Sequence, residues 1–500
     1  MRRSLYKSQN PVIMVDSNTI QHYKTPLVEA MLQYKNKRTI PFDVPGHRYG
    51  RGAKELVQIF GEKALKLDFN SMKSLDILAN PTGVIEEAEK LLANAYGGDH
   101  GYFVVNGTSS AVKSMIMAIC KPNDKIIVPR NAHKSVLSGL ILSGAIPVYL
   151  QPAYDENLGV FQGVIVDEVK QIISENQDAK AILLINPTYY GATSDIKKIV
   201  ALAHEKGIAV IVDEAHGAHL KFHDELPESG MDAGADACAI SMHKTGGSLT
   251  QSSVIVSKDG LLSASNMRKA LNLNGTTSAS YLLMGSLDMA RKNLVINGRR
   301  IFDNVLEMSR EARTEINKIP GLYACGKDLI GAPGVYNFDE TKLVVNVSKI
   351  GLTGFEAYEL LRDEYNIQVE LGDAYNVLAV ISLGDSQYAL KKLVEAFKHM
   401  AVKYGQKEMK MSPLQKIGTL KLAMSPREAY YKEMISIPME QAAGLISGES
   451  IMAYPPGIPI ITPGEVITRE VIEYLYYLKA NQALITDIED ASLSTIKVIR

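Results

Sequence analysis

A lysine that follows a buried strand is the residue of this sequence best placed to do chemistry. Lys244 lies in Ser241-Met242-His243-Lys244-Thr245-Gly246-Gly247, between the apolar runs 237–240 and 254–256. The pattern predicts a tight loop at the end of a buried strand. A partly desolvated ammonium has a lowered pKa and becomes an amine nucleophile. A lone lysine is more often a surface residue, so the interpretation depends on what accompanies it.

An aspartate ends another apolar run upstream of that lysine. Asp213 follows the run 208–212 and precedes Glu214-Ala215-His216. A carboxylate at the end of a buried strand needs a cationic or hydrogen-bonding partner. Asp213 is therefore a second candidate for a functional site.

Two earlier strand ends also carry polar residues. The stretch Asn106-Gly107-Thr108-Ser109-Ser110 joins a strand to a helix, where the glycine permits a close turn and the hydroxyls can cap the helix. Such a helix start binds anions. His133, in Arg130-Asn131-Ala132-His133-Lys134-Ser135, follows the next strand, and its ring can stack on a flat ligand or move protons. Each feature alone is more typical of ordinary structure.

Together, these four features form the set that holds pyridoxal 5′-phosphate. A phosphate binds at a helix N-terminus, an aromatic face covers the ring, an aspartate keeps the pyridine nitrogen protonated and a lysine forms the Schiff base. The sequence therefore predicts a pyridoxal-phosphate site near residues 107–109, 133, 213 and 244.

Two other interpretations of the Asp-Glu-Ala-His stretch are weaker. A nucleotide-hydrolysing helicase also needs a P-loop, and the nearest match, Gly321 to Asp328, ends in aspartate instead of the serine or threonine that holds magnesium. A zinc site needs defined ligand geometry, and three of its four possible ligands lie beyond the strand end. We therefore expect no metal, although the possible zinc ligands are close in sequence: Asp213, His216, His219 and His223.

The elements around these residues alternate between short apolar runs and longer helical patterns. This alternation predicts an α/β fold with a mostly parallel sheet covered by helices on both faces. Ligands bind at the carboxyl ends of the strands in such sheets, where all four features lie. Strands are expected at 102–105, 125–128, 147–150, 181–185 and 208–212, and helices at 84–96, 109–120, 134–142, 164–175 and 195–206.

The pattern changes beyond about residue 300. A long amphipathic helix is expected at 299–319, where Pro320 stops it. A β-α-β-β-α unit follows, at 342–347, 355–365, 368–370, 377–381 and 390–400. We predict four parts: an N-terminal arm with a helix (1–50), a large α/β domain (51–300), a small α+β domain (301–405) and a C-terminal domain (406–500).

Composition limits the class of protein. With 46% apolar and 22% charged residues and a net charge of −1, the 500-residue chain is expected to be globular and to bind no nucleic acid. Its three cysteines are far apart, which is typical of a reducing compartment. Neither a signal peptide nor a membrane span is apparent, so a cytoplasmic location is expected.

Several stretches, among them 106–109, 130–135 and 241–244, resemble those of the bacterial Orn/Lys/Arg decarboxylases. These are fold-type-I pyridoxal-phosphate enzymes with an aspartate-aminotransferase-like large domain. The chain looks most like the short Gram-positive-type biosynthetic arginine decarboxylases. One departure is the stretch 75–79, which reads Leu-Asp-Ile-Leu-Ala where the family often has Leu-Asp-Asp-Leu-His. The matching stretches are 45–47, 106–109, 130–135, 186–191, 212–217, 241–244, 249–252, 454–459 and 463–465.

The resemblance implies a role for each matching residue. Lys244 would form the Schiff base, Asp213 would pair with the pyridinium nitrogen, and His133 would stack on the ring, with His216 beside it. His216 or Lys244 would protonate the α-carbon. The phosphate would be held or flanked by Gly107, Thr108, Ser109, Ser241 and His243, and Thr276 would reach the phosphate of a neighbouring subunit in a homodimer or larger assembly.

The implied reaction is decarboxylation of a basic amino acid in polyamine biosynthesis, arginine first, with lysine or ornithine as alternatives. An aminotransferase and a non-catalytic cofactor-binding regulator remain as further alternatives. A cationic side chain requires a carboxylate, and a bidentate contact would favour arginine. Glu370 is the first candidate for this carboxylate, although a solvated strand end explains it equally well, and Asp373 is the second. His47, in a loop rich in proline and glycine, is a third substrate-binding candidate.

Overall fold

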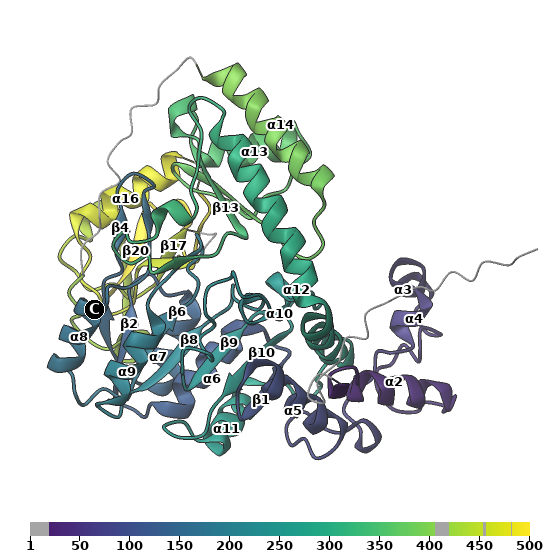
Figure 1. Cartoon of the computed structure of the whole chain (residues 1–500). Coiled ribbons are helices and arrows are strands. Elements are labelled where there is room, and N and C mark those ends of the chain that lie inside the picture. The colour runs from purple at the N-terminus through teal and green to yellow at the C-terminus, as the bar shows by residue number, and fades with distance from the viewer. Residues whose placement is uncertain (1–19, 406–419, 454–456, 482) are drawn as a thin grey trace, which may run out of the picture.

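The computed structural model describes residues 20–405, 420–453, 457–481 and 483–500 (Figure 1). The beginning of the expected N-terminal arm and residues 454–456 of a matching stretch lie outside the described residues. Among the described helices, none is long and apolar enough to cross a membrane.

A seven-stranded mixed sheet forms the centre of the molecule, in the order β1-β10-β9-β8-β6-β2-β3. The expected parallel arrangement is confirmed for β9, β8, β6, β2 and β3, whereas β10 runs antiparallel to both of its neighbours. The connection from β9 to β10, residues 241–252, contains only one turn of helix instead of the crossover helix that usually joins parallel strands. The strands are β1 (His100–Val104), β2 (Lys125–Pro129), β3 (Ile146–Leu150), β6 (Ala181–Ile185), β8 (Ala209–Asp213), β9 (Ala237–Ile240) and β10 (Ser253–Ser257).

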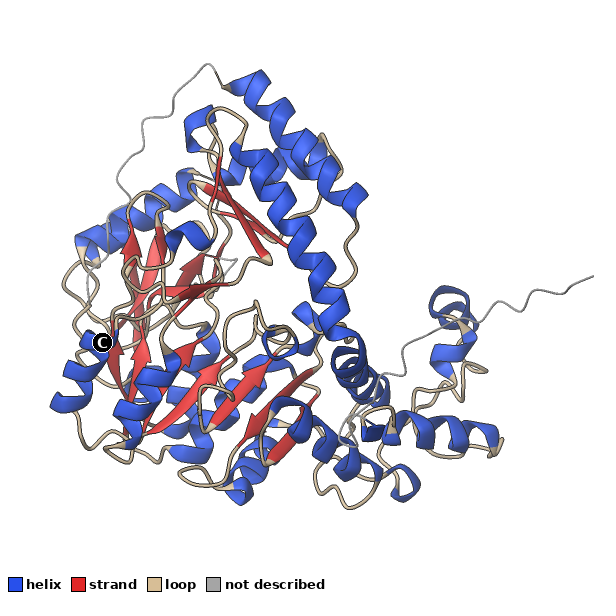
Figure 2. Ribbon diagram, in the orientation of Figure 1, coloured by secondary structure: helices blue, strands red, loops and turns tan. Residues whose placement is uncertain are grey.

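Helices cover both faces of this sheet because alternate strand residues point to opposite sides (Figure 2). On β2, Ile126 and Val128 pack into one buried cluster with α6, α7 and α11, while Ile127 packs into another with α5, α8 and α9. The expected helices are therefore present, with ends that differ by at most two residues: α5 (Val84–Tyr96), α6 (Gly107–Ile119), α7 (Lys134–Ser143), α8 (Val166–Glu175) and α9 (Ile196–His204). Helix α11 spans Ala264–Asn274.

The long helix after the sheet begins 18 residues earlier than expected (299 − 281 = 18), because α12 spans Tyr281–Asn317. Ser280 caps its start, accepting a hydrogen bond from the Leu283 N–H group. The first turns contain glycine and asparagine, which are weak helix formers, but Tyr281 and Met284 are buried against the core. Tertiary packing therefore extends the helix beyond the charged amphipathic segment. The domain boundary expected after residue 300 falls inside α12.

A four-stranded antiparallel sheet, ordered β11-β13-β15-β14, follows α12. The strand expected at 368–370 lies slightly later, because pairing with β15 begins at Leu371 opposite Leu378. Glu370 is therefore at the entry to the strand. The elements of this unit are β11 (Tyr323–Ala324), β13 (Lys342–Asn346), α13 (Gly354–Asp363), β14 (Leu371–Gly372), β15 (Asn376–Val380) and α14 (Gln387–Tyr404).

Two further parts flank these sheets (Figure 1). In the C-terminal part, α16 packs beside short sheets. In the N-terminal part, α2 packs against α5 and α12, and α3 and α4 project from the body. The N-terminal helices are α2 (Pro26–Asn36), α3 (Lys54–Phe60) and α4 (Glu62–Leu65). The C-terminal elements are α15 (Pro426–Tyr431), β16 (Met434–Pro438), β17 (Ile451–Ala453), β18 (Ile458–Ile461), α16 (Arg469–Ala480), β19 (Ile485–Thr486) and β20 (Thr495–Ile499).

Candidate active site

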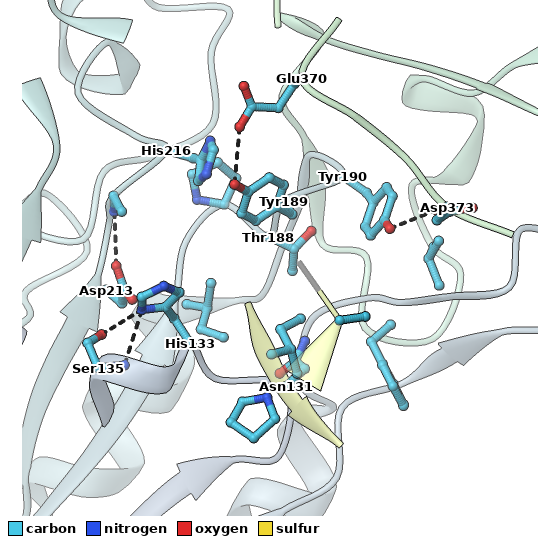
Figure 3. A pocket seen from close by; sticks show the side chains of 18 of the residues that line it. Asn131, His133, Ser135, Thr188, Tyr189, Tyr190, Asp213, His216, Glu370 and Asp373 are labelled. Atoms are coloured by element: carbon cyan, nitrogen blue, oxygen red, sulfur yellow. Dashed lines mark hydrogen bonds between the residues drawn. The ribbon is translucent and has the colours of Figure 1, made fainter. Parts of the chain in front are cut away.

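A cavity of about 570 Å³ lies at the carboxyl ends of β2, β6, β8 and β9 (Figure 3). Parallel strands bring these ends to one edge of the sheet, which is why residues far apart in sequence meet there. Most of the residues singled out from the sequence line it: Gly107, Thr108, Ser109, His133, Asp213, His216, Ser241, His243, Lys244, Glu370 and Asp373.

Lys244 lies in a one-turn helix, α10 (Met242–Thr245), rather than in the expected loop. A turn of helix satisfies backbone groups locally where the chain leaves the buried strand. The Lys244 Nζ atom is 2.8 Å from His216 Nε2 and lies 5.4 Å from the centre of the Tyr189 ring. Burial lowers the pKa of Lys244, while the nearby Asp213 carboxylate opposes the shift. Burial therefore makes the neutral, nucleophilic form of this amine more accessible than in a solvent-exposed lysine.

Asp213 is the last residue of β8 and is almost fully buried. Its Oδ1 atom accepts a hydrogen bond from the Ala215 N–H group at 3.1 Å. Burial raises the pKa of this carboxyl, and the Lys244 ammonium counteracts the effect. A carboxylate in this setting can pair with a cation that enters the cavity.

His133 caps the start of α7 with its own ring. Its Nδ1 atom accepts a hydrogen bond from the Ser135 N–H group at 3.2 Å and lies 2.9 Å from Ser135 Oγ (Figure 3). Burial, followed by the charge of Lys244, lowers the pKa of His133 to about 4. The imidazole is therefore neutral near pH 7, and its flat face can cover an aromatic ligand.

Hydroxyl groups gather at the start of α6. Gly107 has a φ of 75°, and a Cβ atom there would meet no heavy atom within 4 Å, so the backbone is open to the cavity. The expectation that Thr108 caps the helix is wrong: its hydroxyl contacts Ser241 Oγ and, at 2.7 Å, Ser253 Oγ. This arrangement ties α6 to the segment that carries Lys244. The first-turn N–H groups of a helix and nearby hydroxyls suit an anion.

His243 also borders this end of the cavity. Its Nδ1–H group donates to the Ser252 carbonyl oxygen at 2.9 Å, and burial lowers its pKa. The ring is therefore neutral near pH 7 and is fixed on one side by the backbone.

Two carboxylates lie on the opposite side of the cavity, at β14. Tyr189 Oη donates to Glu370 at 3.1 Å, and Tyr190 Oη donates to Asp373 at 2.7 Å (Figure 3). Asp373 also accepts hydrogen bonds from the N–H groups of Tyr375 and Asn376, so its oxygens are occupied. Glu370 is exposed to solvent and has capacity for a further donor.

The C-terminal part closes this side of the cavity. The Arg130 guanidinium donates to the carbonyl oxygens of Pro459 and Ile460 at 2.7 and 2.9 Å and pairs with the fully buried Glu465 at 2.9 Å. Tyr474 of α16 also lines the cavity. Arg130 lies in the matching stretch 130–135, which by itself indicates no role for this residue, and no local sequence pattern marks Tyr474.

Two candidates lie outside the cavity. His47, in the segment before α3, accepts a hydrogen bond from the Gly50 N–H group at 3.0 Å and pairs with Asp68 at 3.1 Å. Thr276, in the connection from α11 to α12, is exposed. Neither residue lines the cavity of this chain. The stretch 75–79, which differs from the family's usual sequence, helps to fix the start of α5, because Asp76 accepts backbone hydrogen bonds there.

The possible zinc ligands do not converge. His216 contacts Lys244, His219 pairs with Asp339, and His223 pairs with Asp303. Within the described ranges, no group of three or more histidine, cysteine, aspartate or glutamate side chains is arranged to hold a metal ion.

The mixed sheet and its active-site edge define the class: the protein has the fold of the fold-type-I pyridoxal-phosphate enzymes. Among solved structures it is similar to a lysine decarboxylase from Francisella novicida, with a TM-score of 0.83 and 21% identity, covering 95% of this chain and 81% of that one. It is also similar to lysine decarboxylase A from Pseudomonas aeruginosa, with a TM-score of 0.83 and 22% identity, over 97% of this chain and 81% of that one. At such identities the likeness concerns the fold.

The chain belongs to the Orn/Lys/Arg decarboxylase family. The model of the family's major domain matches residues 25–389, and that of its C-terminal domain matches residues 407–487. The chain is 42% identical to the arginine decarboxylase of Bacillus subtilis strain 168, over 96% of this chain and 99% of that protein. It is 43% identical to the arginine decarboxylase of Bacillus anthracis, over 96% and 98%.

Proposed function

We propose that this protein is a pyridoxal-phosphate-dependent decarboxylase that converts L-arginine to agmatine and carbon dioxide. The observation that carries the proposal is one cavity that joins a largely buried lysine, a buried aspartate and a neutral histidine to the exposed carboxylate of Glu370. The arginine decarboxylases that are 42–43% identical over nearly the whole chain support arginine over lysine or ornithine.

The residues present fit the cofactor. Three buried polar atoms of residues that line the cavity have no hydrogen-bonding partner among the described residues: Asn131 Oδ1, Thr188 Oγ1 and His216 Nδ1. Buried polar atoms are normally satisfied, so these atoms suit a polar ligand. The open backbone at Gly107 and the nearby hydroxyls suit a phosphate.

Each residue near the cofactor would have a separate task. When bound, pyridoxal phosphate supplies an electron-accepting ring for the pair of electrons left behind as carbon dioxide departs. Lys244 would hold the cofactor through its amine and yield to the substrate amine. Asp213 would keep a proton on the ring nitrogen, and the neutral His133 would cover the ring face.

His216 or Lys244 would return a proton to the α-carbon, since both side chains line the cavity; their nitrogens are 2.8 Å apart. Thr108, Ser109, Ser241 and His243 would hold or flank the phosphate. Breaking the carbon–carbon bond needs no acid or base, so orientation and ring electronics matter most.

Glu370 is the favoured partner for the substrate guanidinium. Its carboxylate is exposed and is oriented by Tyr189, whereas the oxygens of Asp373 already accept several hydrogen bonds. A carboxylate can bind a guanidinium through two parallel hydrogen bonds. Asp373 remains the second candidate. His47 would act on substrate only from a neighbouring subunit, since it lies away from this chain's cavity.

We also propose a homodimer or larger assembly, located in the cytoplasm and acting in polyamine biosynthesis. The projecting N-terminal segment exposes large apolar side chains, including Phe42 at 89% and Ile59 at 75%, which supports contact with another subunit. Thr276 is exposed and available to a neighbour. The four-part domain division, with boundaries after residues 50, 300 and 405, also remains a proposal.

The decisive experiment is release of labelled carbon dioxide from arginine, lysine and ornithine in parallel by protein reconstituted with pyridoxal phosphate. We expect a visible absorbance band that Lys244→Ala removes, and the highest kcat/KM for arginine. A keto-acid product would indicate an aminotransferase, and bound cofactor without turnover would indicate a regulator. A colourless, metal-loaded protein would contradict the proposal altogether.

A further inference from the structure

A fully buried polar cluster lies behind the cavity, outside its lining. Its members come from two parts of the chain. Asp339, Thr341 and Lys342 belong to the segment that begins β13, and His219 and Thr245 belong to the part built on the seven-stranded sheet. None of the five side chains is more than 1% exposed, and none lines the cavity.

An ion pair forms the centre of this cluster. The Lys342 ammonium donates to Asp339 Oδ2 at 2.9 Å, and it lies 3.4 Å from the backbone oxygen of His216. His219 bridges the other side, with Nε2 3.2 Å from Asp339 Oδ1 and Nδ1 3.1 Å from Thr245 Oγ1. Burial alone would raise the pKa of Asp339, but Lys342 and His219 lower it below its usual range, so this carboxyl group is a carboxylate.

The cluster therefore touches three segments of the cavity wall. It reaches the backbone of His216, the side chain of Thr245 beside Lys244, and the loop that carries Tyr189 and Tyr190. The Asp339 N–H group donates to the Gly191 carbonyl oxygen at 2.8 Å at the end of that loop.

A buried ion pair is a weak source of stability, because desolvation of two charges offsets most of their attraction. Its geometric effect is stronger, since charge-assisted hydrogen bonds fix both partners in direction and distance. Here the fixed groups are the backbone of His216 and the helical turn that carries Lys244. The side chains of these two residues are in contact, with Lys244 Nζ 2.8 Å from His216 Nε2.

We propose that Asp339, Lys342 and His219 are positioning residues, which hold His216 and the α10 turn so that the Lys244 amine stays in register with the bound cofactor. The inference rests on the proposed function, which it deepens: the unit that carries Glu370 also sets the geometry of the lysine. These residues act through His216 and Thr245 and contact neither cofactor nor substrate.

The chain offers a matched control in α12. Asp288 and Arg291 form an ion pair at 2.7 Å with the same sequence spacing and the same complete burial as Asp339 and Lys342. Their other hydrogen bonds go to backbone groups of Leu27, His22 and Lys24 and to the ring of His22, and neither residue lines the cavity. Removing this pair tests the loss of a buried ion pair alone.

The experiment compares Asp339→Asn/Lys342→Met with Asp288→Asn/Arg291→Met as full-length proteins reconstituted with pyridoxal phosphate. In the first variant we expect kcat for arginine to fall roughly 10- to 100-fold with KM changed less than about 3-fold, the scale of effect that a misplaced reacting group produces. We also expect the pH titration of the cofactor absorbance to shift. The control variant should keep wild-type kcat and titration, whatever its Tm.

Two further readouts separate a positioning role from general destabilisation. In the apoprotein, the rate at which an amine-reactive reagent labels Lys244, measured by peptide mass spectrometry, should change in the first variant only. Thr245→Val removes one hydrogen bond and no charge, so it should fold normally and lower kcat severalfold. His219→Gln should lower kcat, whereas His223→Gln should leave it unchanged, since His223 pairs with Asp303 away from the cluster.

The inference is overturned if both double variants behave alike, or if Thr245→Val and His219→Gln retain wild-type kcat, titration and labelling. If the wild type decarboxylates no basic amino acid, the proposed function fails. The cofactor titration and the labelling rate still report on positioning in that case, so the two failures are distinguishable.

Discussion

The two ends of the cavity are built in different ways. At the cofactor end, Asp213, His133 and Lys244 follow strands of one sheet, are largely enclosed, and already contact protein groups. At the substrate end, Glu370 comes from another sheet and is exposed, and the wall includes Tyr474 from the C-terminal part. In the proposed function, the chemistry would therefore depend on the parallel sheet, and selectivity on how separate parts of the chain meet.

The largest effect is expected at the cofactor end. Lys244→Ala should remove the visible absorbance band and lower kcat by about 10⁴-fold or more, because Lys244 is the one lysine among the described residues that line the cavity. Lys258→Ala is the matched control: this lysine also follows a sheet strand but contacts the Met231 carbonyl oxygen, away from the cavity. Wild-type absorbance in Lys244→Ala would refute the assignment.

Asp213→Asn should lower kcat by about 10²- to 10³-fold, the usual loss when one preorganised electrostatic partner is removed. An amide of the same shape can still accept the hydrogen bond from the Ala215 N–H group, but without its negative charge it no longer stabilises a protonated ring nitrogen. Absorbance spectra and steady-state kinetics measure the change. Asp236→Asn, at a buried aspartate that bonds to the Val210 N–H group outside the cavity, should change stability without changing the spectrum.

At the substrate end, Glu370→Gln should lower kcat/KM for arginine about 10- to 100-fold, the value of a hydrogen bond to a charged group. The absorbance of the bound cofactor should stay unchanged, which separates the two ends. Asp373→Asn should instead reduce the free energy of unfolding, because its carboxylate accepts backbone hydrogen bonds from Tyr375 and Asn376. If Asp373→Asn alters arginine selectivity more than Glu370→Gln, the order of the two candidates is reversed.

The smallest effect is a pH dependence of stability in the apoprotein. Burial holds the pKa of His133 at about 4 instead of 6.5. Between these values the unfolded chain binds a proton that the native protein does not, so stability is lost as the pH falls from about 6.5 towards 4. His133→Asn keeps an acceptor for the helix cap without titrating.

Denaturant unfolding should therefore show that the free energy of unfolding falls more steeply with decreasing pH in the wild type than in His133→Asn. His216 and His219, whose pKa values burial also lowers, contribute the same slope to both proteins. A constant difference across that range would show that His133 titrates normally.

Much of the fold was predictable from local patterns, because apolar runs and helical periodicity reflect burial directly. The predicted ends of the central parallel strands and of the helices between them lie close to the observed ends. The start of α12 at Tyr281 was missed, because tertiary packing there overrides weak helix formers. The antiparallel direction of β10 was also not foreseen, since strand direction depends on connections rather than on residue pattern.

Two adjacent carboxyl groups near the site also could not be distinguished from the sequence. Asp213 lines the cavity, whereas Glu214 turns into the core, accepts a hydrogen bond from the Gly230 N–H group at 2.8 Å and has a pKa raised by burial to about 8. Their order in the sequence does not distinguish them. The same holds for His216, beside Lys244, and His219, in the buried cluster behind it.

The sequence by itself determined which reactive residues end buried strands, and therefore which edge of the sheet would carry Lys244, Asp213 and His133. That information is local, because the residue following an apolar run emerges where the strand does. Only the tertiary structure decided that Glu370 would face them, that Arg130 and Glu465 would join the C-terminal part to the wall, and that Lys342 would lie behind Lys244. These contacts depend on chain segments that meet only once the separate sheets have packed together.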